Sequence, residues 1–132
     1  MAATLEKALQ DAQVGLKVLQ VLTENSYDSI LVTDATKDAK IIYANKAFKT
    51  LTGYDPSEVI GKTPRILQGP ATDRQVIARL ADALKNEGRF EGKAINYRKD
   101  GAPFIMHWRV LPAKIGSRTK VWVAVQREGF EI

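Results

Sequence analysis

The chain has 132 residues, of which 45% are hydrophobic and 27% are charged, a composition typical of one globular domain with its own core. It contains no cysteine, which excludes disulfides, thiolate metal sites and cysteine nucleophiles. The net charge is +5, but Lys and Arg are scattered along the sequence, so we expect no nucleic-acid-binding surface.

Membrane, targeting and catalytic signals are also missing from the sequence. No apolar run approaches the roughly eighteen residues that a membrane span needs, and no basic segment followed by an apolar core opens the chain. We therefore expect a cytoplasmic protein without a membrane span. No pair of carboxylates and no nucleophile beside a base stands out, so we predict neither an enzyme nor a metal site.

Residues 1–25 predict one amphipathic helix that flanks the rest of the chain, with Thr4 as its N-cap. Its apolar residues recur at alternating spacings of four and three, as in a heptad pattern: Leu5, Leu9, Ala12, Leu16 and Leu19. Such a stripe is typical of a helix packed on its own domain. It is also typical of a helix that pairs with its copy in a dimer or continues toward another domain.

Two strands and two short helices are expected next. β-Branched and aliphatic residues predict strands over residues 29–34 and 41–44, joined by a polar turn. Asn45 is placed to cap a short helix, which Gly53 would end. Asp55 stands directly before a proline and is placed to cap a second short helix.

A longer helix and three strands complete the expected fold. Thr72 opens a capping-box pattern that predicts the helix. Three strand-like segments follow, and an Asp-Gly pair between the first two predicts a hairpin: residues 90–98, 103–113 and 120–126. This order predicts an α+β domain with helices grouped on one face of an antiparallel sheet.

The alternation of side chains along these strands indicates which residues face inward. One face combines apolar, aromatic and amide residues: Ala94, Asn96, Phe104, Met106, Trp108, Val110, Trp122, Ala124 and Gln126. Buried amides need partners, and without a ligand Asn96 and Gln126 could bond each other across neighbouring strands. The single histidine, His107, is expected on the opposite face, where a surface or interface role suits it better than catalysis.

Three groups of residues form an ordered set of motifs. Residues 43–54 contain Tyr-Ala-Asn-Lys-Ala-Phe and Leu-Thr-Gly-Tyr, and residues 65–73 contain Arg-Ile-Leu-Gln-Gly-Pro and Thr-Asp. Residues 96–104 contain Asn-Tyr-Arg-Lys-Asp-Gly and Pro-Phe, and a Val-Gln pair ends the last strand. Together these motifs resemble a PAS domain of the flavin-binding LOV (light-oxygen-voltage) branch. The resemblance implies a five-stranded antiparallel sheet over residues 26–128, with residues 129–132 starting a C-terminal linker.

The resemblance includes one decisive departure. The LOV family carries the motif Gly-x-Asn-Cys-Arg-Phe-Leu-Gln, and its cysteine forms a light-driven thioether with the flavin. In this sequence Thr63 stands for the asparagine and Pro64 for the cysteine. Proline has no nucleophile, so the cysteinyl-flavin adduct cannot form.

Carried over position by position, the resemblance implies residues that would contact a flavin, either FMN or FAD. Gln68 and Asn96 would contact the polar edge of the isoalloxazine ring, and Gln126 would bond to the ring near N5 and O4. Arg65 would pair with the phosphate, and Thr33 would line the pocket. Without a flavin, Gln68 could cap local backbone and Arg65 could pair with a carboxylate.

Other positions differ from what the family usually has. Met106 replaces a second amide, and Trp122 replaces a residue that is commonly phenylalanine. Trp108 is also larger than usual. Each change adds bulk or removes a polar contact, and a packed interior tolerates added bulk only with rearrangement.

Two functions follow from these observations. In the first, a flavin still binds, and the domain senses redox potential or light through electron transfer, with Trp108, Trp122 or a tyrosine as donor. In the second, the larger side chains fill the pocket, and the domain is a ligand-free interaction module. Both describe a sensory domain that forms a homodimer through its N-terminal helix or sheet face and controls an output domain in a longer protein.

Overall fold

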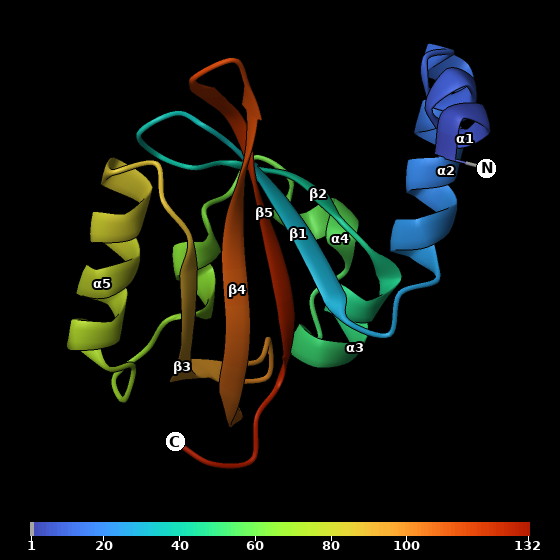
Figure 1. The fold of residues 1–132 in the computed structure, drawn as a ribbon. Helices are drawn as coiled ribbons and strands as arrows, with labels where there is room; N and C mark the ends of the chain where they lie inside the picture. Colours follow the sequence, from blue (N-terminus) through green and yellow to red (C-terminus); the bar gives the residue numbers. More distant parts are fainter. Residues whose placement is uncertain (1) are drawn as a thin grey trace.

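The computed structural model describes residues 2–132, which build a five-stranded antiparallel sheet with helices packed behind it (Figure 1). The elements follow in this order: α1 (Ala2–Leu9), α2 (Ala12–Glu24), β1 (Ser29–Asp34), β2 (Ile41–Ala44), α3 (Lys46–Thr52), α4 (Pro56–Val59), the 3-10 helix η1 (Pro64–Leu67), α5 (Arg74–Lys85), β3 (Phe90–Tyr97), β4 (Pro103–Ile115) and β5 (Arg118–Glu128). The strand order is β2-β1-β5-β4-β3, so the C-terminal strand lies in the centre of the sheet. The predicted α+β fold is confirmed.

The short helices that cover the sheet are set by their caps, as the sequence predicts. The side chain of Asn45 accepts a hydrogen bond from the Phe48 N–H at 3.1 Å, and Gly53 ends α3 in the left-handed region at φ 81°. Asp55 and Glu58 form a capping box at the start of α4, in which the Glu58 carboxylate accepts from the Asp55 N–H at 2.9 Å. The Asp55 carboxylate also accepts from the Ser57 N–H at 3.0 Å. These caps fix the path of the chain between β2 and η1.

The cap of α5 differs from the prediction by one residue. Asp73 is the N-cap, and its carboxylate accepts from the Gln75 N–H at 2.9 Å. Thr72 instead donates its hydroxyl to the carbonyl oxygen of Ile95 at 2.7 Å and accepts from the Gly69 N–H at 3.0 Å. A hydroxyl anchored to β3 cannot cap α5, so the predicted role of Thr72 is wrong.

The N-terminal region is two helices rather than one. The carboxylate of Asp11 accepts from the N–H groups of Gln13 and Val14 at 2.9 Å and 3.3 Å, and so starts α2 as a new helix. Thr4 lies inside α1 and is not its N-cap. The break interrupts the predicted apolar stripe, and the side chain of Leu5 lies outside the part of the chain that the structure describes.

The inward face of the sheet is the one predicted from alternation. Its buried residues include Ala94, Asn96, Phe104, Met106, Trp108, Val110, Trp122, Ala124 and Gln126. On the helical side the core is completed by Phe48, Val59 and Leu67. In the register of β4 with β5, Trp108 lies opposite Gln126, which places the large rings and the amide next to each other.

Candidate functional site

The space between the sheet and the helices η1 and α5 is almost filled by side chains. One cavity of about 70 Å³ remains, lined by Leu31, Thr33, Ala39, Pro64, Leu80, Leu84, Trp108, Val110, Trp122, Ala124 and Gln126. A second, of about 40 Å³, is lined by Pro64, Leu67, Gln68, Ile77, Leu80, Asn96, Met106, Trp108 and Gln126. These two cavities include four of the five residues that the resemblance implies for flavin contact, all except Arg65, and the four positions that depart from the family: Pro64, Met106, Trp108 and Trp122.

Two buried tryptophans are the largest side chains in this space. Trp108 on β4 and Trp122 on β5 are only 6% and 7% exposed. The ring of Trp108 also packs on that of Phe90, with centroids 5.1 Å apart. Because both indoles project from the centre of the sheet, they occupy the space that an open pocket would need.

The two interior amides do not bond each other, so the pairing that the sequence allowed for a ligand-free interior is not observed. Strand β4 separates β3, which carries Asn96, from β5, which carries Gln126. The side chain of Asn96 donates to the sulfur of Met106 at 3.3 Å, and Gln126 accepts from the hydroxyl of Ser29 at 3.0 Å. Each amide therefore has a partner from a different strand.

Gln68 and Arg65 lie at the mouth of this region. The side-chain oxygen of Gln68 accepts from the guanidinium of Arg74 at 2.8 Å, rather than capping local backbone. Arg65 is exposed, and its Nε donates to the hydroxyl of Thr63 at 3.3 Å. Among residues 2–132, the ion pairs given by the structure do not include Arg65, so the expected pairing with a carboxylate is not observed.

The residues present do not leave room for a flavin in this conformation. Pockets for ligands of this size have volumes of about 300 Å³ or more, whereas the two cavities measure about 70 Å³ and 40 Å³. A flavin ring would have to displace the indoles of Trp108 and Trp122. The amides that face this space are suited to the polar edge of a flavin ring, but the cavities are too small to hold the ring.

Sequence reasoning missed the residues that connect this interior to the N-terminal helices. Ser29, the partner of Gln126, stands at the start of β1. Asn45 is fully buried and does more than cap α3, because its Oδ1 accepts from the Ile30 N–H and its Nδ2 donates to carbonyl oxygens of Thr23 and Asp28. Its side chain thus joins α2, β1 and α3, a role that capping rules alone do not reveal.

A tyrosine adds a second tie between the sheet and α2. The hydroxyl of Tyr43 on β2 lies 2.9 Å from the hydroxyl of Thr23 and 2.5 Å from a carboxylate oxygen of Glu24. Partial burial, together with the bond to Glu24, raises the pKa of Tyr43 above its ordinary value. The phenol therefore stays protonated and donates to α2 at neutral pH.

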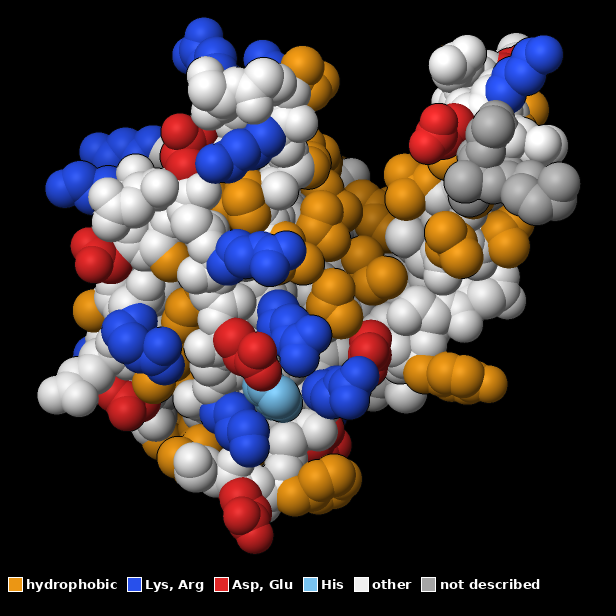
Figure 2. Space-filling view, in the orientation of Figure 1, with side chains coloured by type: hydrophobic (Ala, Val, Ile, Leu, Met, Phe, Trp, Pro, Cys, Tyr) orange, Lys and Arg blue, Asp and Glu red, His pale blue; other side chains and the backbone are white. Residues whose placement is uncertain are grey.

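The outer face of the sheet is polar on β3 and the neighbouring part of β4. His107 and Arg109 both contact Glu91, at 2.7 Å and 3.1 Å. The bond from His107 holds the pKa of the Glu91 carboxyl below its ordinary value, and the charge of Arg109 acts in the same direction. His107 is seen on this face in Figure 2, surrounded by charged side chains, which confirms its predicted orientation away from the interior.

Within residues 2–132, no cluster of His, Asp or Glu side chains is arranged to hold a metal ion. None of the helices in the same range has the length and apolar character needed to cross a membrane.

Comparison with known proteins places this fold and site in a family. The family described as "PAS domain" matches residues 28–128. The chain therefore belongs to the PAS domain family. Its LOV branch is indicated by the solved LOV domain of a blue-light activated histidine kinase from Erythrobacter litoralis, with 34% identity and a TM-score of 0.75 over 79% of this chain and 97% of that one.

Two curated relatives are by name a phototropin and a blue-light-activated histidine kinase. Phototropin-2 of Oryza sativa subsp. japonica is 43% identical over 109 residues, which cover 82% of this chain and 11% of the relative. A blue-light-activated histidine kinase of Brucella anthropi is 44% identical over 77 residues, which cover 58% of this chain and 16% of the relative. The chain thus spans only a small part of the length of these proteins.

Proposed function

We propose that this chain is a signal-transmitting PAS domain of the LOV branch that works without a flavin, because its own side chains fill the ligand site. The observation that carries this proposal is the packing of Trp108 and Trp122 between the sheet and the helices η1 and α5. A cysteinyl adduct has no place in the mechanism, since the sequence contains no cysteine.

The domain transmits changes in interior packing to its N-terminal helices. The bond between Gln126 and Ser29 couples β5 to the start of β1. The next residue of β1, Ile30, donates its N–H to the side chain of Asn45. The same side chain donates to the carbonyl oxygen of Thr23 in the last turn of α2. A shift of β5 is therefore passed through these two bonds to α2, which is the kind of element that a signal can bias between two positions.

Association of two copies through α2 and the outer sheet face completes the proposal. Leu16, Leu19 and Leu22 on α2 are 57%, 57% and 65% exposed. Figure 2 shows hydrophobic side chains continuing from these helices onto the adjoining half of the sheet. A continuous apolar surface of this kind is typical of a protein interface. The output would belong to a longer protein, as it does in the histidine kinase relatives.

One observation favours a second candidate, a flavin-dependent redox or light sensor. Gln68, Asn96 and Gln126 converge on the same small cavity beside Pro64. Three amides around one space are suited to the polar edge of FMN or FAD. This candidate requires that Trp108 and Trp122 turn out of the cavity when the ligand enters.

The absorption spectrum of the purified protein separates the two candidates. We expect no blue-light band, and no band after incubation with excess FMN or FAD and removal of the free ligand. A structured blue-light absorption band would overturn the proposal if the absorbing compound is released into the small-molecule fraction when the protein is denatured. The solved LOV domains provide the positive control for loading and detection.

A further inference from the structure

A basic end of the molecule is created where two segments far apart in the sequence meet. Residues 85–89 connect α5 to β3, and residues 114–120 form the tip of the β4–β5 hairpin. The N–H of Thr119 donates to the carboxylate of Glu87 at 3.1 Å, which ties the two segments together. Figure 1 shows both at the upper end of the sheet.

The charge of this end is strongly unbalanced. The two segments carry five basic residues and one acidic residue, and so contribute +4 to the net charge of +5: Lys85, Arg89, Lys114, Arg118 and Lys120 against Glu87. All of these side chains are exposed. Glu87 is itself engaged, because the bond from Thr119 and the charges of Lys114 and Arg118 hold the pKa of its carboxyl below the ordinary value. The remaining cations face solvent, and basic side chains gather at this end in Figure 2.

An apolar side chain projects from the middle of these charges. Ile115 is 72% exposed, at the end of β4 where Ala113 and Lys114 are exposed as well. It pairs with Arg118 across a two-residue turn, in which Gly116 takes a φ of 64° that favours glycine. The hairpin therefore presents an isoleucine at its tip, flanked by Lys114 and Arg118.

We propose that this hairpin tip docks on an anionic lipid surface. Clusters of four or more Lys and Arg attract negatively charged bilayers, and an apolar side chain beside them can enter the interface. Nucleic acid fits less well, because neither segment contains an aromatic residue on which a base could stack. The tip is also a projecting turn rather than a groove that could follow a phosphate backbone. The proposal is independent of whether the interior binds a ligand.

Vesicle co-sedimentation tests this surface with the intact chain. We expect the protein to sediment with phosphatidylcholine vesicles that contain phosphatidylserine, but not with phosphatidylcholine alone, and to be released by salt. The double variant Lys114→Glu with Arg118→Glu should lower the partition coefficient by at least about 25-fold, from roughly fivefold for each Lys or Arg lost from the surface, and the two added carboxylates lower it further. Ile115→Ser should lower it by about fivefold.

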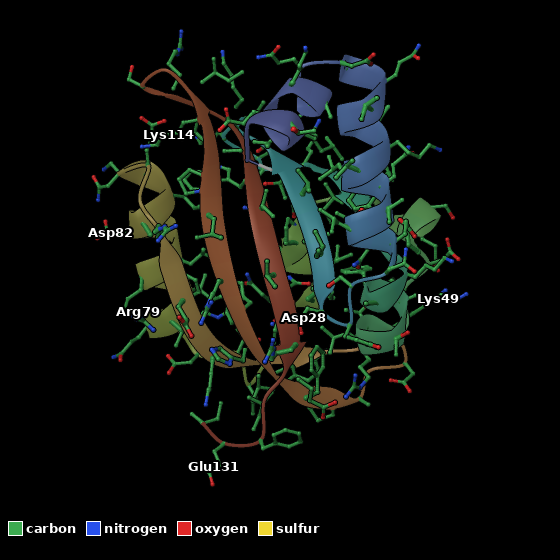
Figure 3. The ribbon with its side chains drawn as sticks, turned by 45° about the vertical axis from the view of Figure 1, so that its right-hand side comes forward. Asp28, Lys49, Arg79, Asp82, Lys114 and Glu131 are labelled. Carbon is green, nitrogen blue, oxygen red and sulfur yellow. The ribbon has the colours of Figure 1, made fainter. Side chains whose placement is uncertain are left out.

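The matched control makes two Lys→Glu substitutions, and so the same change in net charge, at a distant part of the surface. Lys46→Glu with Lys49→Glu alters α3, and Figure 3 shows Lys49 far from Lys114. Unfolding curves establish that each variant is folded. No sedimentation with phosphatidylserine vesicles, or an equal loss in the control pair, would overturn the proposal. Binding of a short nucleic-acid duplex that the hairpin variants abolish, without binding to vesicles, would assign the surface to nucleic acid instead.

Discussion

The inner face of the sheet and the N-terminal helices place large apolar side chains in opposite environments. On the inner face Trp108 and Trp122 are 6% and 7% exposed, whereas on α2 Leu19 and Leu22 are 57% and 65% exposed. In the first region large apolar side chains are buried between the sheet and the helices. In the second they are uncovered. This contrast is the basis of our proposal that the domain acts through its surface rather than through a ligand in its interior.

The largest expected effect comes from emptying the inner face. Trp108→Ala should lower the free energy of unfolding by about 3–5 kcal/mol, because it removes a buried ring and leaves a cavity. Urea denaturation followed by circular dichroism measures this change. Ile115→Ala, at an exposed position, should stay within about 0.5 kcal/mol of the parent. A Trp108→Ala protein as stable as the parent would mean that the indole does not fill the core.

The connection between the two regions is tested at Asn45. Asn45→Ala removes a helix cap, the side-chain acceptor of the Ile30 N–H and one of the donors to the Thr23 carbonyl. We expect a loss of about 2–3 kcal/mol in the free energy of unfolding. The substitution should also accelerate amide hydrogen exchange more in α2 than in β4 or β5.

Asn86→Ala is the control for the previous variant. Asn86 also bonds backbone near a helix end, but it is exposed at the end of α5. Its replacement should cost less than about 1 kcal/mol and leave exchange in α2 unchanged. Equal acceleration in all elements of the Asn45 variant would contradict a specific link to α2.

The uncovered region is tested by charging it. Leu16→Asp with Leu19→Asp should convert a dimer into a monomer in multi-angle light scattering, because carboxylates cannot be buried unpaired in an apolar interface. The effect on the stability of the separate domain should be within about 1 kcal/mol, since both side chains are exposed. Gln13→Asp with Gln20→Asp on the same helix is the control for charge. A mass that none of these variants changes would exclude α2 from the interface.

The smallest expected effect is a pH dependence on the surface. The bond from Lys99, at 2.7 Å, is the main cause that lowers the pKa of Glu58 below its ordinary value of 4.5. A carboxyl whose pKa is lower in the folded than in the unfolded state stabilises the fold above the unfolded value, and this contribution disappears as the pH falls through the folded value. Glu58→Gln keeps an acceptor for the capping box but removes the charge. Its stability deficit should therefore be present at pH 7 and vanish in acid, as measured by urea unfolding at several pH values.

Glu131→Gln, near the exposed end of the chain, is the control for charge. A deficit that is the same at all pH values would contradict the ionic contribution.

Local rules predicted the elements better than the contacts among them. Asn45, Gly53 and Asp55 act at the helix ends where the sequence placed them, because caps depend on residues three or fewer positions away. Thr72 fails as a cap because Ile95, a residue of a distant strand, takes its hydroxyl. The single N-terminal helix fails because apolar periodicity alone gave no weight to Asp11 as an internal start.

In the candidate site, too, local rules predicted which side chains face inward but not which partners they bond. Side-chain alternation correctly assigned the nine inward-facing residues of β3, β4 and β5, since a period of two follows from strand geometry. The partners of Asn96 and Gln126 were not predictable in this way, because they depend on which strands are neighbours. Ser29 became the partner of Gln126 only because β5 pairs with β1 at the centre of the sheet.

The sequence by itself determined the order of the strands along the chain, the inward face of β3, β4 and β5, and the impossibility of cysteine chemistry. These properties depend on neighbours along the chain or on composition alone. Only the tertiary structure decided that two indoles leave cavities of about 70 Å³ and 40 Å³, and that basic residues scattered along the sequence gather around Ile115. Volume and surface charge are sums over residues brought together from distant positions, so no local pattern contains them.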